Sequence, residues 1–166
     1  MPFLPIRPLL DLDMAAALAL NNEHAVELSV ETPSTWDDLV SAAWAAWGIV
    51  DEDGRLAALS IALDDVGMTR GPNHRWFQER RKNSVYVDRV VTAPFARQRG
   101  LARQLDVALI DAAKRAGRES VVCEVNLDPP NPGSLAFHER LGFVPVGKAV
   151  LADRGKTVRY LERRRL

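Results

Sequence analysis

The sequence predicts an α/β protein in which helices and strands mix without strict alternation. Three observations carry this prediction: an alternating apolar run at residues 84–92, a long amphipathic pattern after Gly100, and turn residues that divide the chain into the order β-α-α-β-β-loop-β-α-β-α-β-β. A doubly wound parallel sheet would alternate strand and helix more regularly. The length of 166 residues and the hydrophobic content of 47% suit one substantial core, so we expect a single domain over residues 1–166.

The first part of the chain predicts an edge strand, two helices and a hairpin. Three early prolines limit the pairing of the first strand. Asp11 or Asp13 caps the first helix, and the Asp53-Gly54 dipeptide, which tolerates positive φ, suits the hairpin turn. The expected elements are a strand at 3–7, a helix from the aspartate cap to about Leu28, a helix from Thr32-Pro33-Ser34 to about Trp47, and strands at 46–50 and 55–63.

The second part of the chain predicts two helices among further strands. Glycine and proline residues favour a loop with a helical turn at 66–82. Asn131 as cap, Pro132 at the first helical position and Gly142 after the last turn frame a short helix. The other elements are a strand at 84–92, a helix at 101–116, a strand at 119–126, the short helix at 132–141, and paired strands at 143–151 and 157–163.

Charge is distributed unevenly along a chain whose formal net charge is zero. Residues 1–69 contain two arginines and twelve acidic residues, whereas residues 70–103 contain nine basic and two acidic residues. The basic segment would attract a polyanionic cofactor. The acidic residues would favour a cationic substrate, such as an amine that accepts a transferred group. The alternative is that they form an ordinary solvated surface. No nucleic-acid-binding module is recognisable, so we expect no nucleic-acid partner.

Cysteine content and hydropathy narrow the class of protein further. Cys123 is the single cysteine, which excludes an internal disulfide and leaves no clustered metal pattern, so we expect a reducing cytoplasm and no metal. No segment approaches the roughly 20 apolar residues of a membrane span, and residues 1–8 lack the pattern of a secretory signal. We therefore expect neither membrane association nor secretion.

The most informative motif joins the strand at 84–92 to the following helix, and reads Arg97-Gln98-Arg99-Gly100-Leu101-Ala102. The first amides of a helix lack intrahelical acceptors and lie at the positive end of its dipole, so they can hold a phosphate, which Gly100 would let approach closely. Neither G-x-G-x-x-G nor G-x-x-x-x-G-K-[ST] fits this spacing. The loop instead resembles [RQ]-x-x-G-x-[GA], the coenzyme A signature of the GNAT superfamily of N-acetyltransferases.

A second segment is similar to another GNAT signature, N-x-x-[SA]-x-x-[FL]-[Y]-E-[KR]-L-G-F. It reads Asn131-Pro132-Gly133-Ser134-Leu135-Ala136-Phe137-His138-Glu139-Arg140-Leu141-Gly142-Phe143, and only the histidine departs from the pattern, at a tyrosine position. The resemblance covers Tyr86 to Gly147. It implies the GNAT-like acyl-CoA N-acyltransferase fold, a central mixed β-sheet flanked by helices with splayed central strands. It also implies acetyl-CoA (coenzyme A) as co-substrate and leaves a homodimer open.

The resemblance implies which residues hold acetyl-CoA. A backbone amide at residues 90–92 would bind the thioester oxygen, and amides at 98–102 would bind the pyrophosphate. Asn131 would reach the pantetheine while also capping its helix. The cofactor-binding residues expected on this basis are Val90, Val91, Thr92, Arg97, Gln98, Arg99, Gly100, Leu101, Ala102, Arg103, Asn131, Ser134, Phe137 and His138.

Acetyl transfer to an amine needs an acid for the leaving thiolate. His138 stands where family tyrosines are thought to supply that proton. A histidine with a pKa of about 6.5 is only partly protonated at neutrality, unless a neighbouring carboxylate raises its pKa. His138 is therefore either the acid or a residue that lines the cleft, and Tyr86 is the substitute donor.

The reaction also needs a base for the amine. Glu124 and Asp88 are expected in mid-strand, where a carboxylate is unusual when both sheet faces are covered, and this favours a cleft position for each. Glu124 is placed slightly ahead of Asp88 as the base. Structural pairing, with Arg89 or Arg75, is the alternative for either carboxylate.

The sequence thus predicts an acyltransferase, with the acceptor bound by elements that the family varies. We expect Asn22, Asn73, Arg75 and Trp76 to contact the acceptor, which is a small amine or amino-acid-like metabolite, or an amine of a peptide or protein. Direct attack by a primary amine is favoured over a covalent enzyme intermediate, because Cys123 falls in a buried strand. The alternative is a non-catalytic acetyl-CoA-binding sensor or assembly module, which the histidine at position 138 keeps open.

Overall fold

The computed structural model describes residues 4–24 and 28–166. The chain forms two compact units: the first unit contains residues 1–63 and 87–109, and the second unit contains residues 64–86 and 110–166. Two parts of the expected elements, residue 3 of the first strand and residues 25–27 of the first helix, lie outside the described residues. The single domain expected over residues 1–166 stays a prediction.

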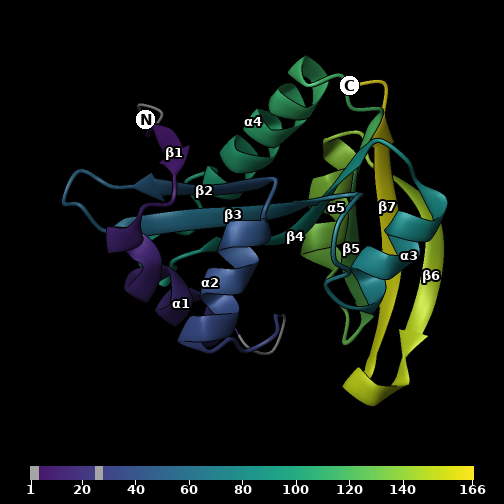
Figure 1. Ribbon diagram of the computed structural model, residues 1–166, viewed down its shortest axis with the longest axis horizontal. Helices are drawn as coiled ribbons and strands as arrows, with labels where there is room; N and C mark the ends of the chain where they lie inside the picture. The colour runs from purple at the N-terminus through teal and green to yellow at the C-terminus, as the bar shows by residue number, and fades with distance from the viewer. Residues whose placement is uncertain (1–3, 25–27) are drawn as a thin grey trace. The chain divides into compact units, whose positions relative to one another are not determined.

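Helices and strands follow the predicted mixed order (Figure 1). The strands are β1 (Ile6–Pro8), β2 (Ala45–Val50), β3 (Leu56–Asp64), β4 (Ser84–Thr92), β5 (Ser120–Asp128), β6 (Val144–Leu151) and β7 (Lys156–Arg164). The α-helices are α1 (Met14–Glu23), α2 (Pro33–Ala42), α3 (Pro72–Arg80), α4 (Leu101–Arg115) and α5 (Pro132–Arg140). Over the described residues, the strands form a seven-stranded sheet in the order β1-β2-β3-β4-β5-β7-β6.

The sheet is mixed, which confirms the predicted fold class. The pairs β1–β2, β2–β3, β5–β7 and β6–β7 are antiparallel, and β4 pairs with β5 in parallel. The hairpin of β2 and β3 is confirmed, with Ala45 opposite Ala62. β1 is displaced from the expected range, since it begins at Ile6 and includes Pro8. The expected splay of the central strands stays a prediction.

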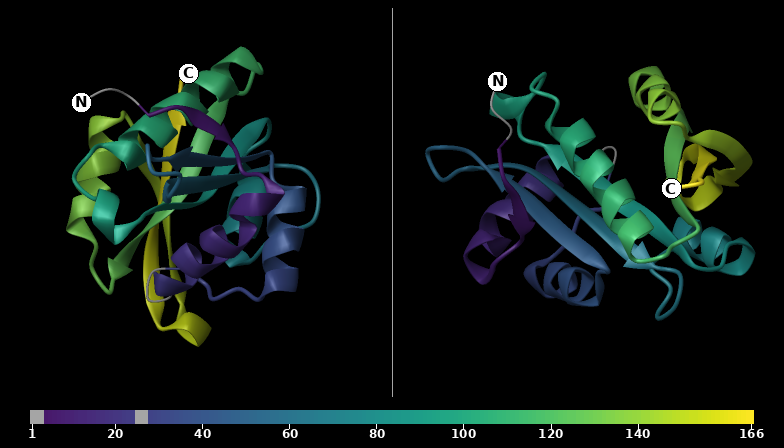
Figure 2. Two further views of the ribbon diagram at one scale, coloured as in Figure 1. Left: turned by 90° about the vertical axis from the view of Figure 1, so that its left-hand side faces the viewer. Right: turned by 90° about the horizontal axis from the view of Figure 1, so that it is seen from above.

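In the first unit, helices cover both faces of β2 and β3. α1 and α2 lie on one face, and the first turns of α4 lie on the other (Figures 1 and 2). β3 is buried along nearly its whole length, which explains why its sequence is an almost continuous apolar run. One core cluster joins β2, β3 and α4 through Leu4, Ile49, Ala57, Ala58, Ala96, Leu101 and Leu105.

The first helix is shorter than the sequence predicts. α1 ends at Glu23, and Leu28 lies in a bend, so the expected continuation to Leu28 is wrong. The side-chain amides of Asn21 and Asn22 donate to the carbonyls of residues 29 and 31. Asparagine side chains that bond to the backbone in this way compete with helix continuation.

The second helix is also shorter, although its start is as predicted. Thr32 caps α2 and its side chain accepts a hydrogen bond from the Thr35 amide at 3.2 Å. The helix ends at Ala42, and Trp47 belongs to β2 instead. The expected helix end at about Trp47 is therefore wrong, because the strand pairing with β3 begins at Ala45.

In the second unit, β5, β7 and β6 are consecutive antiparallel neighbours, with Cys123 opposite Leu161. α3 and α5 cover opposite faces of these strands (Figures 1 and 2). Gly142 follows α5 with a φ of +85°, and Gly155 follows the turn after β6 with a φ of +61°. The strands and the helix expected here are confirmed, with bounds that shift by two residues at most.

The segment before β4 differs from its prediction. It contains a helix, α3, rather than a loop with a helical turn. Gly71 stands at the N-cap with a φ of +96°, and Pro72 takes the first helical position, where its missing N–H costs nothing. The helix carries Asn73, Arg75 and Trp76, three residues that were expected to contact the acceptor.

Candidate active site

The connection from β4 to α4, in the first unit, has the backbone geometry of an anion site. β4 ends at Thr92, a 3-10 turn spans Pro94–Ala96, and Gly100 precedes α4 with a φ of +72°. The carbonyl of Gly100 accepts a hydrogen bond from the Gln104 amide at 3.0 Å, which closes the first helical turn. The amides of that first turn therefore have no intrahelical acceptors.

The side chains and the space around this loop also fit a phosphate group. Arg97, Arg99 and Arg103 are exposed, and a Cβ added to Gly100 would meet no atom within 4 Å. Exposed guanidinium groups beside free helical amides are suited to a pyrophosphate. Gln98 has a φ of +63°, a left-handed conformation that the sequence pattern did not predict. The residues present thus fit the group that the resemblance assigns to them.

A phenol and a carboxylate meet in the second unit, where β4 and β5 begin side by side. Tyr86 pairs with Val122 in the parallel register, so Glu124 lies two residues further along β5. The Tyr86 hydroxyl donates a hydrogen bond to Glu124 Oε2 at 2.7 Å. Tyr86 is buried and Glu124 is half-buried. The structure therefore brings two of the expected catalytic residues into a short hydrogen bond between a phenol and a carboxylate.

His74 of α3 packs against the Tyr86 ring, with ring centroids 5.3 Å apart. Its Nδ1 accepts a hydrogen bond from the Arg70 amide at 3.0 Å, and its Nε2 lies 2.8 Å from the Asp64 carbonyl, to which it donates. Backbone groups at both ring nitrogens fix the orientation of the imidazole. His74 thus holds the face of Tyr86 and has a structural role.

Tyr160 of β7 lies opposite Glu124 in the antiparallel register. Its hydroxyl donates to Asn73 Oδ1 at 2.9 Å, and the Trp76 ring stacks on it at 4.2 Å between centroids. Burial, and then the negative charge of Glu124, raise the pKa of Tyr160 to about 12. Of the expected acceptor contacts on α3, Asn73 and Trp76 pack on Tyr160, and Arg75 is exposed.

The second signature segment, also in the second unit, folds around its predicted cap. Asn131 Oδ1 accepts a hydrogen bond from the Ser134 amide at 3.2 Å. His138 Nδ1 lies 2.7 Å from the Ser134 carbonyl and donates to it, so the lone pair of the neutral ring is on Nε2. Phe137 and Phe143 contact the imidazole edge-on, each at 5.2 Å between centroids.

Burial lowers the pKa of His138, and the hydrogen bond to Ser134 only partly opposes this shift. The sequence left open that a neighbouring carboxylate raises this pKa, and the shift has the opposite direction. An imidazole with a lowered pKa is neutral at neutral pH. The Nε2 atom of this neutral ring can then accept a hydrogen bond.

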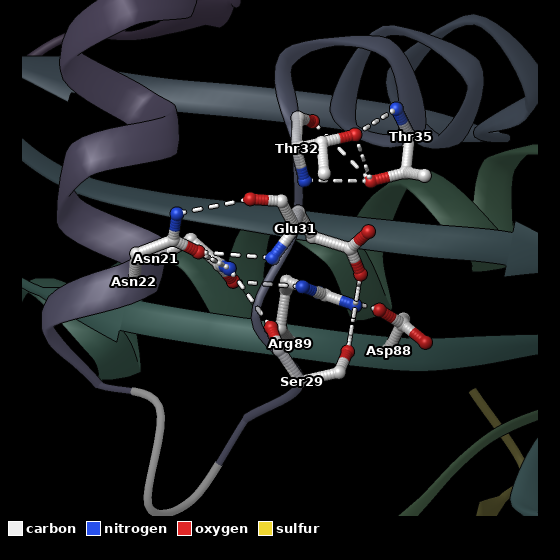
Figure 3. Close-up of polar contacts among 8 residues, drawn as sticks. All are labelled: Asn21, Asn22, Ser29, Glu31, Thr32, Thr35, Asp88 and Arg89. Atoms are coloured by element: carbon white, nitrogen blue, oxygen red, sulfur yellow. Dashed lines mark hydrogen bonds and ion pairs between the residues drawn. The ribbon is translucent and has the colours of Figure 1, made fainter.

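Asp88 lies in the first unit and forms an ion pair with Arg89, the next residue of β4 (Figure 3). Arg89 Nε donates to Asp88 Oδ2 at 2.6 Å. This contact is the structural pairing that the sequence offered as the alternative for a mid-strand carboxylate. Asn22, an expected acceptor contact, bonds instead to Glu31: its amide donates to the carbonyl and its oxygen accepts from the N–H, each at 3.0 Å.

Sequence reasoning missed Tyr160 and Asn21 as members of these clusters. Tyr160 becomes a neighbour of Glu124 only through the pairing of β5 with β7. Asn21 is fully buried and accepts a hydrogen bond from Arg89, a residue 68 positions away. The one available signal was the Asn21-Asn22 pair at the end of a helical pattern, which favours a helix end with backbone-bonding side chains.

Comparison with known sequences decides the family. The sequence model of the Acetyltransferase (GNAT) family matches residues 19–143, a range that contains both signature segments. The chain belongs to this family. It is therefore an acyltransferase of the acetyl-CoA-dependent GNAT class.

Solved structures of other GNAT proteins share this fold. The ribosomal-protein-S18-alanine N-acetyltransferase from Escherichia coli superposes with a TM-score of 0.74 at 18% identity, over 98% of this chain and 94% of that chain. The ribosomal-protein-alanine N-acetyltransferase from Brucella melitensis gives 0.74 at 20% identity, over 97% and 99%. The spermidine N-acetyltransferase from Vibrio cholerae, in complex with CoA and spermine, gives 0.72 at 18% identity, over 97% and 95%.

Within residues 4–24 and 28–166, no group of three or more His, Cys, Asp or Glu side chains is arranged to hold a metal ion. In the same described part of the GNAT chain, no helix combines the length and the apolar character that crossing a membrane requires.

Proposed function

We propose that this GNAT protein moves the acetyl group of acetyl-CoA directly to a primary amine, with both substrates bound at once. The observation that carries the proposal is the 2.7 Å hydrogen bond from Tyr86 to Glu124, which pairs a proton donor with a proton acceptor on neighbouring strands. A covalent acetyl-enzyme is disfavoured, because the thiol of Cys123 is buried in β5.

Glu124 is the proposed base and Tyr86 the proposed acid. A protonated amine loses one proton to the solvent before it can attack, and a second proton as the amide forms. Glu124 accepts the second proton, and the Tyr86 phenol donates its own to the departing sulfur. The Glu124 carboxyl then returns a proton to the Tyr86 phenolate, so that the pair ends as it began. Asp88 is the alternative base.

We assign His138 to the lining of the cleft rather than to proton donation. Its lowered pKa and the hydrogen bond from Nδ1 to the Ser134 carbonyl support this assignment. An acid at this position would need a proton on Nε2, and the favoured tautomer carries its single ring proton on Nδ1. His138 then accepts a hydrogen bond where family tyrosines would donate one.

Two segments are proposed to hold acetyl-CoA, which supplies the activated acetyl group when bound. The first-turn amides of α4 and the arginines beside them bind the pyrophosphate, supported by the open space and positive φ at Gly100. The amides at 90–92 bind the thioester oxygen, as the resemblance implies. Asn131, Ser134 and Phe137 of the second signature contact the pantetheine.

The acceptor is proposed to be a primary amine, either of a small metabolite or of a peptide or protein. Structural neighbours are named for both kinds, a ribosomal protein alanine and spermidine. The surplus of acidic residues in 1–69 supports a cationic amine within either class.

The test is release of free coenzyme A from acetyl-CoA with a panel of amines, amino acids, polyamines and short peptides. We expect turnover with at least one acceptor, and a loss of kcat of about 100-fold or more in Glu124→Gln and about 10-fold or more in Tyr86→Phe. Tyr160→Phe is the matched control, since it also removes a buried phenol hydroxyl and its hydrogen bond. Its kcat should stay within about threefold of wild type.

Two results would contradict the proposal. Equal losses in Tyr86→Phe and Tyr160→Phe would show that any buried hydroxyl near β5 matters for stability alone. Tight binding of acetyl-CoA without turnover of any acceptor would favour the non-catalytic sensor.

A further inference from the structure

Arg89 lies in the middle of β4 and is 7% exposed, and its guanidinium bonds to three segments of the first unit (Figure 3). Nη1 donates to Asn21 Oδ1 at 2.7 Å, and Nε donates to Asp88 Oδ2 at 2.6 Å. Nη2 lies 3.4 Å from Ser29 Oγ and 3.5 Å from Glu31 Oε1. One buried cation thus connects α1, the segment before α2, and β4.

The bond to Arg89 sets the direction of the Asn21 amide. With Oδ1 toward the guanidinium, Nδ2 donates to the Ser29 carbonyl and to Asn22 Oδ1, each at 3.0 Å. Asn22 then bonds to both the N–H and the carbonyl of Glu31. A reversed Asn21 amide would put its NH₂ group against the guanidinium, donor against donor. Arg89 therefore determines how residues 29–31 are held against the end of α1.

The guanidinium faces the protein and not a ligand. Its side chain is 6% exposed, and each of its three nitrogens donates to a protein oxygen. A buried arginine on a central strand would otherwise suggest a receptor for a substrate carboxylate. Asp88 and Glu31 already supply two carboxylates to this one cation. An acceptor carboxylate would therefore have to displace a protein partner.

Asp88 lies in this cluster and also close to the proposed binding site of the acetyl-CoA thioester. Residues i and i+2 of a strand lie about 7 Å apart on the same face, so Asp88 lies about that far from Val90. The amides at 90–92 are the proposed site of the thioester oxygen. An amine that attacks this thioester from the side of Asp88 would lie within reach of the residues that Arg89 orders.

We propose that Arg89 is a positioning residue for the acceptor: it holds Asp88 and residues 29–31 in the arrangement that binds the amine, and does not itself touch the acceptor. The proposal rests on the function proposed above. It implies that the acceptor needs no carboxylate for recognition by Arg89.

Steady-state kinetics of Arg89→Lys test the role in acceptor binding. Lysine keeps the charge but lacks the planar fork that bonds to several acceptors at once. We expect the acceptor KM to rise at least tenfold, while kcat and the KM for acetyl-CoA stay within about threefold. Arg7→Lys is the matched control, because Arg7 makes two hydrogen bonds to the buried Asp13 in the same unit. Equal changes in both substrates' KM values, or the same changes in the control, would overturn the proposal.

A milder variant separates positioning from general destabilisation. Ser29→Ala removes a hydroxyl that bonds to Glu31 and contacts Arg89, on an exposed residue. We expect a rise of about threefold in the acceptor KM of Ser29→Ala alone, and no further rise when it is added to Arg89→Lys. Additive effects would show that the two residues act independently.

A matched pair of acceptors separates positioning from direct recognition. The best acceptor is compared with an analogue that differs by one carboxylate, as cadaverine differs from lysine. Arg89→Lys should raise the KM of both by the same factor. A larger rise for the carboxylate-bearing acceptor would mean that Arg89 binds the substrate, and would overturn the positioning role.

Hydrogen exchange tests the positioning role without any turnover. The Glu31 amide is bonded to Asn22 Oδ1, so we expect it to exchange at least tenfold faster in Arg89→Lys and unchanged in Arg7→Lys. Unchanged protection would overturn the proposal even if the enzyme were active. Loss of protection together with a wild type that acetylates no amine would instead place the failure in the proposed function.

Discussion

The indole of Trp76 covers Gly147 so closely that a Cβ on residue 147 would lie 2.5 Å from Trp76 Cζ2. The same indole stacks on Tyr160 with the two rings inclined by 19°, and the Arg80 guanidinium lies 4.5 Å from its ring centroid. The Trp76 indole therefore packs α3 against both β6 and β7. This packing requires the smallest side chain at position 147.

Gly147→Ala should destabilise the protein by about 1–3 kcal/mol, because the added methyl group overlaps a ring that is itself held in place. Urea unfolding at constant m-value measures this change. Gly133→Ala is the control, since a Cβ there meets nothing within 4 Å, and it should be neutral or stabilising in α5. Equal effects of the two substitutions would contradict the role of Trp76.

Gly100 and Gly117 offer a matched test of the cofactor loop. Both have a φ of +72°, both would accept a Cβ without contact within 4 Å, and they lie just before and just after α4. Alanine at either position should cost about 1 kcal/mol of stability through backbone strain. Only Gly100→Ala should weaken coenzyme A binding, by about tenfold in calorimetry, because its methyl group faces the proposed phosphate. A similar loss in Gly117→Ala would contradict that position for the phosphate.

The pH dependence of turnover tests the role of His138. Burial lowers its pKa below the ordinary value of about 6.5, so the ring stays neutral from about pH 7 upward. His138→Gln should therefore change kcat by a constant factor between pH 7 and pH 9. If His138 were the acid, the advantage of wild type would shrink as rising pH removed its proton.

Asp106 makes the stability of the fold depend on pH. Burial raises its pKa to about 7, above the value of about 3.9 in an unfolded chain. The folded state then retains a proton that the unfolded state loses, so stability falls as pH rises from about 4 to 7 and the loss is complete above that range. Asp106→Asn should be more stable than wild type by about 1–4 kcal/mol at pH 8, with a much smaller gain at pH 5. Asp111→Asn, on the exposed side of the same helix, is the control for the effect of an aspartate-to-asparagine substitution in α4 on urea unfolding.

Experiments on Cys123 test whether the acetyl group passes directly to the amine without a covalent enzyme intermediate. Cys123 is 3% exposed, so its thiol should resist alkylation in the folded protein and react only on unfolding. Cys123→Ala should keep kcat within about twofold, with a loss of stability of about 1 kcal/mol. Mass spectrometry after incubation with acetyl-CoA alone should find no acetylated Cys123, and an acetyl group there would revive a covalent intermediate.

The sequence predicts elements well where local signals agree with the packing. β4 has the predicted bounds, because its apolar alternation is followed by Pro94, which cannot continue the strand. α5 follows its Asn131 cap and Pro132. α3 was not predicted as a full helix, because its polar sequence lacks an apolar stripe. The Gly71-Pro72 pair is the only local signal of a helix start.

In the candidate site, too, some features could be predicted from local sequence and others could not. The geometry of the loop around Gly100 could be predicted, because the motif that indicates it consists of consecutive residues. Tyr86 and Glu124 were identified singly, but their contact depends on the parallel register of two strands, which no local pattern encodes. The cluster around Arg89 joins residues 58 and 68 positions apart, so it becomes visible only when the chain is folded.

The passage of the chain between the two compact units has a consequence for synthesis and proteolysis. The boundaries at 86–87 and 109–110 fall inside β4 and inside α4, so each unit is built from two separate stretches. During translation, residues 64–86 leave the ribosome before residues 87–109, which complete the first unit. Residues 110–166, with which residues 64–86 form the second unit, are synthesised last. A protease that cuts between residues 86 and 87, within β4, separates the two stretches of each unit and so damages both units together.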